Sequence, residues 1–443
     1  MNVCLIAIDT LRADHLSCYG YRRLTSPHID EIASRGVLFE EFFAPHIPTH
    51  PGFTTMFTGK DVFSHQVVAQ GGKREPPRGV RMLAQILKKR GYFCACADNM
   101  GRWFARGFEL RQSYRWERDP GQPWRKGEAV NEAAFLVLEA CARRRRPWFA
   151  FLHYWDPHTP YLPPPPFSRM FYCGNERDPK NRSMDGVWAS EPFRDYFRAW
   201  MGGVTDIEFP KAQYDAEIAY CDACLRHVFT RMEKLGLLND TLLIITADHG
   251  EELDEHEMWF DHHGLYDTNL HVPLIMYHRE RLPAGKRIRG MARHMDLAPT
   301  ILDLLGMPDA AEEAQMEGQS LVPWIDGSGE VRVCDELYLT ECTWMRKRGI
   351  RTRRYKYIHA REPDYHGRPE YELYDLKADP EEQHNLAEER PELVQRMERK
   401  LRAWCARRAE ETGLPDPIET QGITLRRIGN INVAVPENQK LEK

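Results

Sequence analysis

Short apolar runs alternate with amphipathic segments along the first two thirds of the chain. Five runs have the continuous apolar character of fully buried strands, at Val3–Ile8, Tyr92–Ala97, Trp148–His153, Thr241–Thr246 and Val272–Tyr277. Segments with helical spacing lie between them, at His28–Arg35, Arg81–Arg90 and Tyr214–Leu235. This alternation predicts an α/β fold in which helices sandwich a mostly parallel sheet.

The pattern changes near residue 336. Short strand-like pieces at Leu337–Glu341, Gly349–Thr352, Tyr355–His359 and Glu372–Leu376 precede a helix at Pro391–Arg408. We therefore expect a large domain over 1–335, a small C-terminal α+β subdomain built on a short antiparallel sheet over 336–412, and a tail over 413–443. The tail, with a candidate edge strand at Asn430–Val435, could wrap the core or a neighbouring subunit, which leaves a homo-oligomer open.

Polar side chains follow three of the predicted strands directly. Asp9, the pair Asp156 and His158, and the pair Asp248 and His249 all come just after an apolar run. Open α/β sheets bind ligands at the carboxyl ends of their strands, and carboxylate with imidazole is a ligand set for divalent cations. Helix capping explains Asp9 alone equally well, but it does not explain adjacent ionisable residues at 248 and 249. The run from Pro163 to about residue 210 is expected to form part of the substrate rim.

Charge and cysteine content narrow the class of protein. The 443 residues carry a net charge of −5 from 61 basic and 66 acidic side chains, so we expect no nucleic-acid partner. No apolar run reaches the ~18–20 residues of a membrane span, and no signal-peptide pattern precedes Val3, so no membrane partner is expected. Eleven scattered cysteines favour a reducing, cytoplasmic location. Cys221 and Cys224 have no second pair and are expected to be buried helix residues.

Several blocks together resemble one family. They read Ile8-Asp9-Thr10-Leu11-Arg12-Ala13-Asp14-His15-Leu16, Phe151-Leu152-His153-Tyr154-Trp155-Asp156-Pro157-His158, Ala247-Asp248-His249-Gly250-Glu251-Glu252 and, near the C-terminus, Glu372-Leu373-Tyr374-Asp375-Leu376. In this order, over roughly residues 3–405, they resemble the sulfatase-like family of the alkaline phosphatase superfamily. The resemblance implies an alkaline-phosphatase-like catalytic domain over 1–335 and a metal-dependent ester hydrolase.

One position departs from the sulfatase pattern. Family sulfatases carry Cys or Ser, then Pro two residues on and Arg four residues on, and oxidise the Cys or Ser to formylglycine. This chain has Thr49 at the nucleophile position and Phe53 at the Arg position. Threonine cannot become formylglycine, because its β-carbon carries a methyl group. The chain therefore resembles the Thr-nucleophile branch of the superfamily, which includes phosphodiesterases, and it resembles phosphonate monoester hydrolases.

The resemblance also implies the site. Asp9, Thr49, Asp248 and His249 would surround one divalent cation, Mn²⁺, Zn²⁺ or Ca²⁺. His262 falls where sulfatases have a Lys and His158 matches a His opposite it, while Asn99 and His263 are further candidate substrate contacts. His262 could act as a general acid or hold a second cation. We lean towards the cation, because Asp261, His262 and His263 together offer more ligand capacity than one acid needs.

These inferences predict a hydrolase of small-molecule phospho- or sulfo-esters. We expect it to cleave phosphodiesters or phosphonate monoesters through a covalent phospho-threonine, since a sulfo-threonine lacks the exit that formylglycine provides. A sulfatase without formylglycine is the first alternative, and a non-catalytic metal-binding relative is the second.

Overall fold

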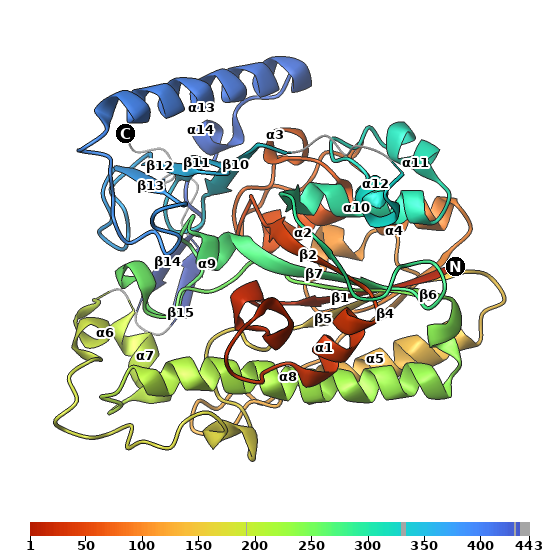
Figure 1. The fold of residues 1–443 in the computed structure, drawn as a ribbon, viewed down its shortest axis with the longest axis horizontal. Helices are drawn as coiled ribbons and strands as arrows, with labels where there is room; N and C mark the ends of the chain where they lie inside the picture. The colour runs from red at the N-terminus through yellow and green to blue at the C-terminus, as the bar shows by residue number, and fades with distance from the viewer. Residues whose placement is uncertain (192, 329–333, 429–430, 435–443) are drawn as a thin grey trace.

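The main sheet runs through the centre of the molecule (Figure 1). The computed structural model describes residues 1–191, 193–328, 334–428 and 431–434. Within them the sheet has nine strands in the order β4-β3-β5-β1-β6-β7-β2-β8, with β9 beside β2. The bounds are β1 Asn2–Ile8, β2 Val37–Phe43, β3 Phe93–Ala97, β4 Leu110–Gln112, β5 Trp148–Tyr154, β6 Thr241–Thr246, β7 His271–Tyr277, β8 Lys286–Ile288 and β9 Ala292–Arg293. Among these described strands, β7 pairs antiparallel with β6 and with β2, and all the other pairs are parallel. The predicted mostly parallel sheet is therefore confirmed.

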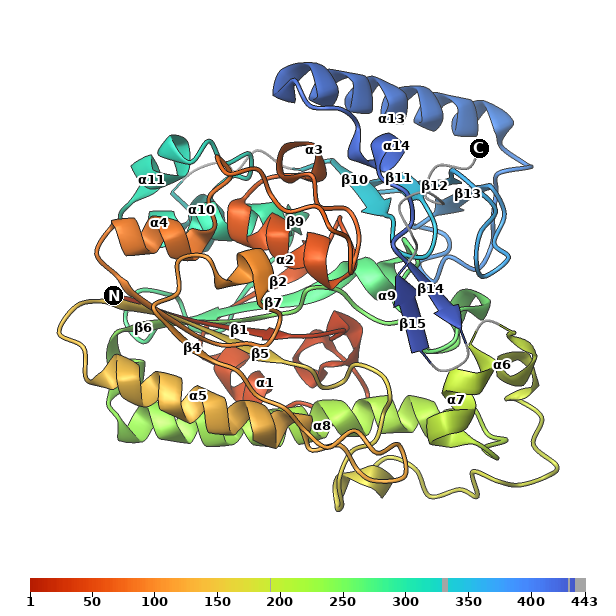
Figure 2. The same ribbon diagram turned by 180° about the vertical axis from the view of Figure 1, so that it is seen from behind.

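Helices cover both faces of this sheet, as the two opposite views show (Figures 1 and 2). One face carries α1 (Pro27–Ser34), α5 (Lys126–Ala142) and α8 (Glu208–Lys234). The other carries α2 (Thr49–Thr58), α4 (Leu83–Lys89), α10 (His294–Leu304), α11 (Pro308–Glu313) and α12 (Val322–Asp326). The long helix α8 begins at Glu208, before the expected Tyr214. Its first turn contains Pro210, which a helix accepts at that position but which usually signals a break in the sequence pattern.

A second sheet and a helix form the C-terminal part. The strands β10 (Glu336–Glu341), β11 (Lys347–Thr352), β12 (Tyr355–Ala360) and β13 (Tyr371–Asp375) are antiparallel in sequence order. Helix α13 (Pro391–Thr412) continues past the expected Arg408 and packs its Met397, Leu401 and Trp404 into a second apolar core with Phe63 of α3 (Val62–His65). The small antiparallel sheet expected from the sequence is confirmed.

The tail returns to the body of the protein. After α14 (Pro417–Thr420), a hairpin of β14 (Leu425–Ile428) and β15 (Ile431–Ala434) follows. The hydroxyl of Thr424 donates to the Gln70 carbonyl, and its backbone N–H donates to Thr343. The two ends of the expected strand Asn430–Val435 lie outside the described residues.

Two further expectations concern cysteines and membrane spans. Cys221 and Cys224 lie on α8 and are buried without a disulfide bond, as expected of helix residues. None of the helices described here combines the length and the apolar character that crossing a bilayer requires.

Asp267 joins the two sheets electrostatically. It begins α9 (Asp267–Leu270), and its carboxylate accepts from Arg351 Nη2 at 2.7 Å on β11 and from Lys356 Nζ at 2.6 Å on β12. The Lys356 side chain is completely buried and also lies 2.7 Å from Glu382 Oε1. Two cations of the small sheet therefore share one carboxylate of the large domain.

Replacing Asp267 with alanine should lower the free energy of unfolding by about 2–4 kcal/mol, because buried Arg351 loses its carboxylate partner and Lys356 keeps only Glu382. Chemical denaturation monitored by circular dichroism measures this change. Asp335→Ala removes a pair with Arg353 that is exposed on both sides and should leave the transition nearly unchanged. Equal effects of the two substitutions would contradict the role assigned to Asp267.

Candidate active site

Three ionisable side chains meet where β1 and β6 end. Asp9 follows β1, and Asp248 and His249 follow β6, the strand hydrogen-bonded to β1. His249 Nε2 lies 3.7 Å from Asp9 Oδ1 and 3.4 Å from Asp248 Oδ2. One ligand atom from each of the three lies within 4.8 Å of the others, and all three side chains are fully buried. The parallel neighbours β1 and β6 therefore bring together residues that are more than two hundred positions apart.

Local backbone geometry holds this group in place. Thr10 has a φ of 56°, the left-handed region that threonine rarely adopts, and the Tyr214 hydroxyl fixes its carbonyl at 2.7 Å. Gly52 in the first turn of α2 lies so close to the β6 loop that a Cβ would come within 2.8 Å of the Asp248 carbonyl oxygen. The glycine thus lets the N-terminus of α2 approach the two carboxylates.

Thr49 is the first residue of α2 and faces this group. Its Oγ1 lies 3.2 Å from His249 Nε2, and the residue is 4% exposed. His249 Nδ1 donates to the Gly250 carbonyl at 2.9 Å, so the lone pair of the neutral ring is on Nε2. Phe53, at the position of the sulfatase Arg, is fully buried against His153 and Phe151. The helix N-terminus favours a developing anion at Thr49.

The residues at this point fit a divalent cation. In the described chain neither oxygen of Asp9 accepts a hydrogen bond, nor does Asp248 Oδ2. Burial and then the charge of Asp9 raise the pKa of Asp248 to about 6. Burial also acts to raise the pKa of Asp9, but His153 and the other nearby imidazoles lower it overall. Two buried carboxylates with unused oxygens, one imidazole and one hydroxyl form a mixed O/N ligand set.

His153 contacts the Asp9 carboxylate, a role that was not predicted from the sequence. This residue lies on β5, with Nε2 3.6 Å from Asp9 Oδ2 and Nδ1 3.0 Å from Asp98 Oδ1. Burial acts to lower the pKa of His153, but the interactions of its ring with Asp9 and Asp98 outweigh this effect and raise the pKa to about 9. A histidine inside the buried apolar run Trp148–His153 is the sequence feature that could have indicated this role.

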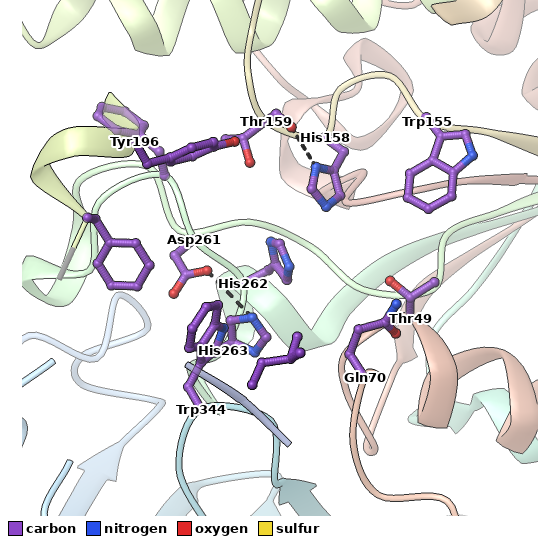
Figure 3. A pocket seen from close by; sticks show the side chains of 13 residues that line it. Thr49, Gln70, Trp155, His158, Thr159, Tyr196, Asp261, His262, His263 and Trp344 are labelled. Carbon is purple, nitrogen blue, oxygen red and sulfur yellow. Dashed lines mark hydrogen bonds and ion pairs between the residues drawn. The ribbon is translucent and has the colours of Figure 1, made fainter. Parts of the chain in front are cut away.

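A cavity of about 260 Å³ opens beside Thr49 (Figure 3). Its wall includes His158, His262, His263 and several aromatic side chains: Trp155, Phe193, Tyr196, Phe260 and Trp344. Phe193 and Tyr196 come from the long excursion that the sequence assigned to the substrate rim, and Leu425 comes from the tail. The cavity is therefore bordered by the large domain, the small sheet and the tail.

Three predicted substrate contacts, His158, His262 and His263, line this wall, and a fourth, Asn99, lies behind it. The rings of His158 and His262 are 5.0 Å apart, and His262 stacks on His249 at 4.7 Å. Burial lowers the pKa of His158. Asn99 is not among the described residues that line the cavity. Its Oδ1 accepts a hydrogen bond from the indole N–H of Trp155 at 3.0 Å. A direct contact of Asn99 with substrate stays a prediction.

Comparisons with known proteins agree with this fold. A family model described as "Sulfatase" matches residues 1–307, and one described as "N-sulphoglucosamine sulphohydrolase, C-terminal" matches residues 254–407. An N-acetylglucosamine-6-O-sulfatase of Bacteroides thetaiotaomicron is 22% identical over 90% of this chain and 85% of its own length. The multifunctional alkaline phosphatase superfamily protein PehA of Trinickia caryophylli is 25% identical over 96% and 99%. The solved phosphonate monoester hydrolase of Agrobacterium radiobacter is 23% identical, with a TM-score of 0.74 over 98% and 99%.

The chain therefore belongs to the sulfatase family, within the alkaline phosphatase superfamily. It is an ester hydrolase of that family, whose members depend on a metal, and it carries side-chain groups able to hold one. A small-molecule ester fits this family as substrate. The relatives include sulfatases and phosphonate monoester hydrolases alike, so the family leaves the choice between phosphorus and sulfur open.

Asp248→Asn should lower bound metal and reduce ester turnover at least about 10²-fold, because one anionic ligand is replaced by a neutral amide. Metal analysis of the purified variant, with circular dichroism for the fold, measures both effects. Asp240→Asn is the matched control at the opposite, exposed end of β6 and should retain metal and turnover. Normal metal content and normal turnover in Asp248→Asn would refute the ligand assignment.

Proposed function

We propose that this protein hydrolyses small phosphodiesters or phosphonate monoesters through a covalent phospho-threonine at Thr49. The observation that carries the proposal is the position of the Thr49 hydroxyl. It lies at the N-terminus of α2, 3.2 Å from His249 Nε2, and that nitrogen lies 3.7 Å from Asp9 Oδ1 and 3.4 Å from Asp248 Oδ2. A hydroxyl is a weak nucleophile unless a neighbouring group stabilises its anion.

In this proposal Asp9, Thr49, Asp248 and His249 hold one divalent cation. The cation would act as a Lewis acid that lowers the pKa of the Thr49 hydroxyl and balances charge on the reacting ester. The chain's own residues then determine the geometry. The helix N-terminus holds Oγ1 in the site, and His153 fixes the Asp9 carboxylate from its far side at 3.6 Å.

The reaction proceeds by two displacements at phosphorus. Thr49 Oγ1 forms a bond to phosphorus as the bond to the leaving oxygen breaks, and the hydroxyl proton passes to solvent. Water then forms a new bond to phosphorus and releases Thr49. His158 and His262 lie on the cavity wall on which we place the departing oxygen, and the aromatic wall would contact the rest of the alcohol.

A sulfatase activity is the second candidate. The sulfatases among the relatives favour it. Thr49 opposes it, because a sulfated threonine cannot eliminate to an aldehyde as hydrated formylglycine does. Phe53 supports the same conclusion, since a buried aromatic side chain occupies the position of the Arg that accompanies formylglycine in the family pattern.

Turnover of four matched aryl esters tests the choice of substrate. We expect the phosphodiester and the phosphonate monoester to have the highest kcat/KM, above the phosphomonoester and the sulfate ester. A sulfate ester turned over best by a wide margin would reverse the ranking. A metal-loaded protein that turns over none of the four would support the non-catalytic alternative.

Substitutions at Thr49 test the nucleophile. Thr49→Ala should reduce turnover at least about 10³-fold, because it removes the attacking oxygen, whereas Thr49→Ser keeps that oxygen and should stay within about tenfold of the wild type. Thr54→Ser, one turn along the same helix, is the matched control, since its hydroxyl bonds to the His50 carbonyl. Substantial turnover by Thr49→Ala would exclude a threonine nucleophile.

A further inference from the structure

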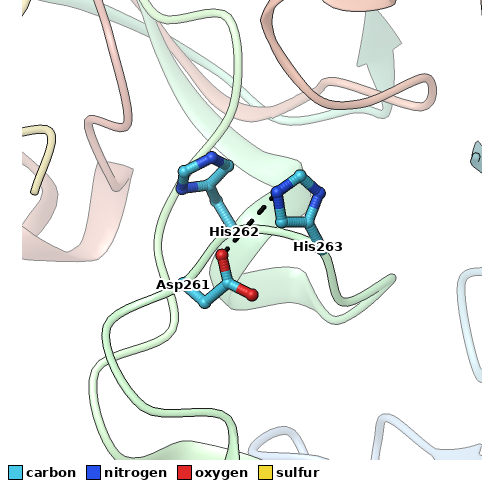
Figure 4. Close-up of side chains that lie close together, drawn as sticks. All are labelled: Asp261, His262 and His263. Atoms are coloured by element: carbon cyan, nitrogen blue, oxygen red, sulfur yellow. Dashed lines mark ion pairs between the residues drawn. The ribbon is translucent and has the colours of Figure 1, made fainter. Parts of the chain in front are cut away.

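A second group of possible ligands adjoins the first. Asp261, His262 and His263 are consecutive residues, and one ligand atom from each lies within 4.8 Å of the others (Figure 4). All three line the cavity that contains Thr49. His262 forms the boundary between the groups, because its ring stacks on His249 with centroids 4.7 Å apart.

Buried carboxylates orient both imidazoles of this group. Glu251 Oε2 lies 3.1 Å from His262 Nδ1, and Glu341 Oε1 lies 3.2 Å from His263 Nδ1. A carboxylate accepts the Nδ1 proton, so the lone pair of each neutral ring is on Nε2. Metal-binding histidines typically have their second nitrogen held in this way, as His249 is by the Gly250 carbonyl.

Asp261 completes the ligand set. Its Oδ1 lies 3.7 Å from His263 Nε2, close to the roughly 3.3–3.5 Å that separates two ligands of one tetrahedral zinc ion. Its Oδ2 lies 3.0 Å from His366 Nε2, which holds the other side of the carboxylate. The Asp261 side chain is 7% exposed.

The carboxylates around this group have only histidines as ion-pair partners among the described residues. Glu251 and Glu341 are fully buried and Asp261 nearly so. Among the ion pairs of the described chain, these three carboxylates contact histidines alone, and neither lysine nor arginine pairs with them. Buried carboxylates need a compensating cation. A divalent ion at the two Nε2 atoms would supply it.

We propose that Asp261, His262 and His263 bind a second divalent cation of the zinc class. Two imidazoles with one carboxylate, and a fourth position open to the cavity, are the ligand set of catalytic zinc. The proposal rests on the proposed function only for its catalytic role. There, the bond from phosphorus to the leaving oxygen breaks with its electron pair on that oxygen, and a cation beside it would stabilise the charge until water donates a proton.

Metal content after saturation with zinc, followed by desalting, tests the site directly. We expect about two ions per chain in the wild type and about one in Asp261→Asn and in His263→Gln. His384→Gln is the matched control, because His384 also pairs with a glutamate, Glu389, but on the exposed surface, and it should retain both ions. About one ion in the wild type, unchanged by Asp261→Asn, would overturn the proposal.

An anomalous difference map at the zinc edge gives an independent answer if a variant fails to fold. A peak among Asp261, His262 and His263 in the wild type supports the site, and no peak there with the Asp9 site filled overturns it. Failure of the proposed function is distinguishable, because two bound ions without ester turnover would contradict that function and leave this site intact.

The leaving group distinguishes the cation from a general acid at His262. With a cation, His262→Ala should slow nitrophenyl esters and alkyl esters alike and lose one ion. A protonated His262 acting as an acid would instead make poor leaving groups suffer far more, by about 10²–10⁴-fold, with no ion lost, and that result would overturn the proposal.

Discussion

The structure depends on two buried carboxylates that lie side by side. Asp9 and Asp248 follow neighbouring parallel strands, and both are fully buried. In the described chain both Asp9 oxygens and Asp248 Oδ2 lack hydrogen-bond partners. Like charges at this spacing repel in a medium of low dielectric constant, so the arrangement is stable only with positive charge nearby. The elements around the two carboxylates supply part of it through His153 and the N-terminus of α2, and the ligand set fits a cation that supplies the rest.

Beyond Asp9 and Asp248, buried carboxylates also contact the histidines of the cavity wall. The ring of His262 lies between those of His249 and His263. Glu251 contacts His262, and Glu341 contacts His263. The site thus has a row of imidazole side chains, bordered by buried carboxylates, from Asp9 to Asp261. Such an arrangement suits an anionic ester, whose phosphoryl oxygens need cations on one side and whose leaving oxygen needs one on the other.

Strands and strand-end residues were predictable because their signals are local. The buried runs that form β1 and β6 end directly before Asp9 and before Ala247-Asp248-His249. Parallel pairing of the two strands therefore places Asp9 near Asp248 and His249. Asp267 and Glu341 carry no such signal, since their partners lie far away in the chain and only the docking of the small sheet creates the contacts. The start of α8 was not predictable from the pattern, because its first turn contains Pro210, a residue that usually marks the end of a helix. A cytoplasmic location and a homo-oligomer stay predictions.

Mass spectrometry of the acid-quenched reaction tests the central claim most directly. During steady-state turnover of an aryl phosphodiester or phosphonate, the peptide containing Thr49 should carry the phosphoryl or phosphonyl group, and the label should disappear once the substrate is exhausted. The experiment uses the substrate with the best leaving group, for which formation of the adduct is fastest. A group attached to a different residue, or turnover of that substrate by Thr49→Ala at the wild-type rate, would contradict the account.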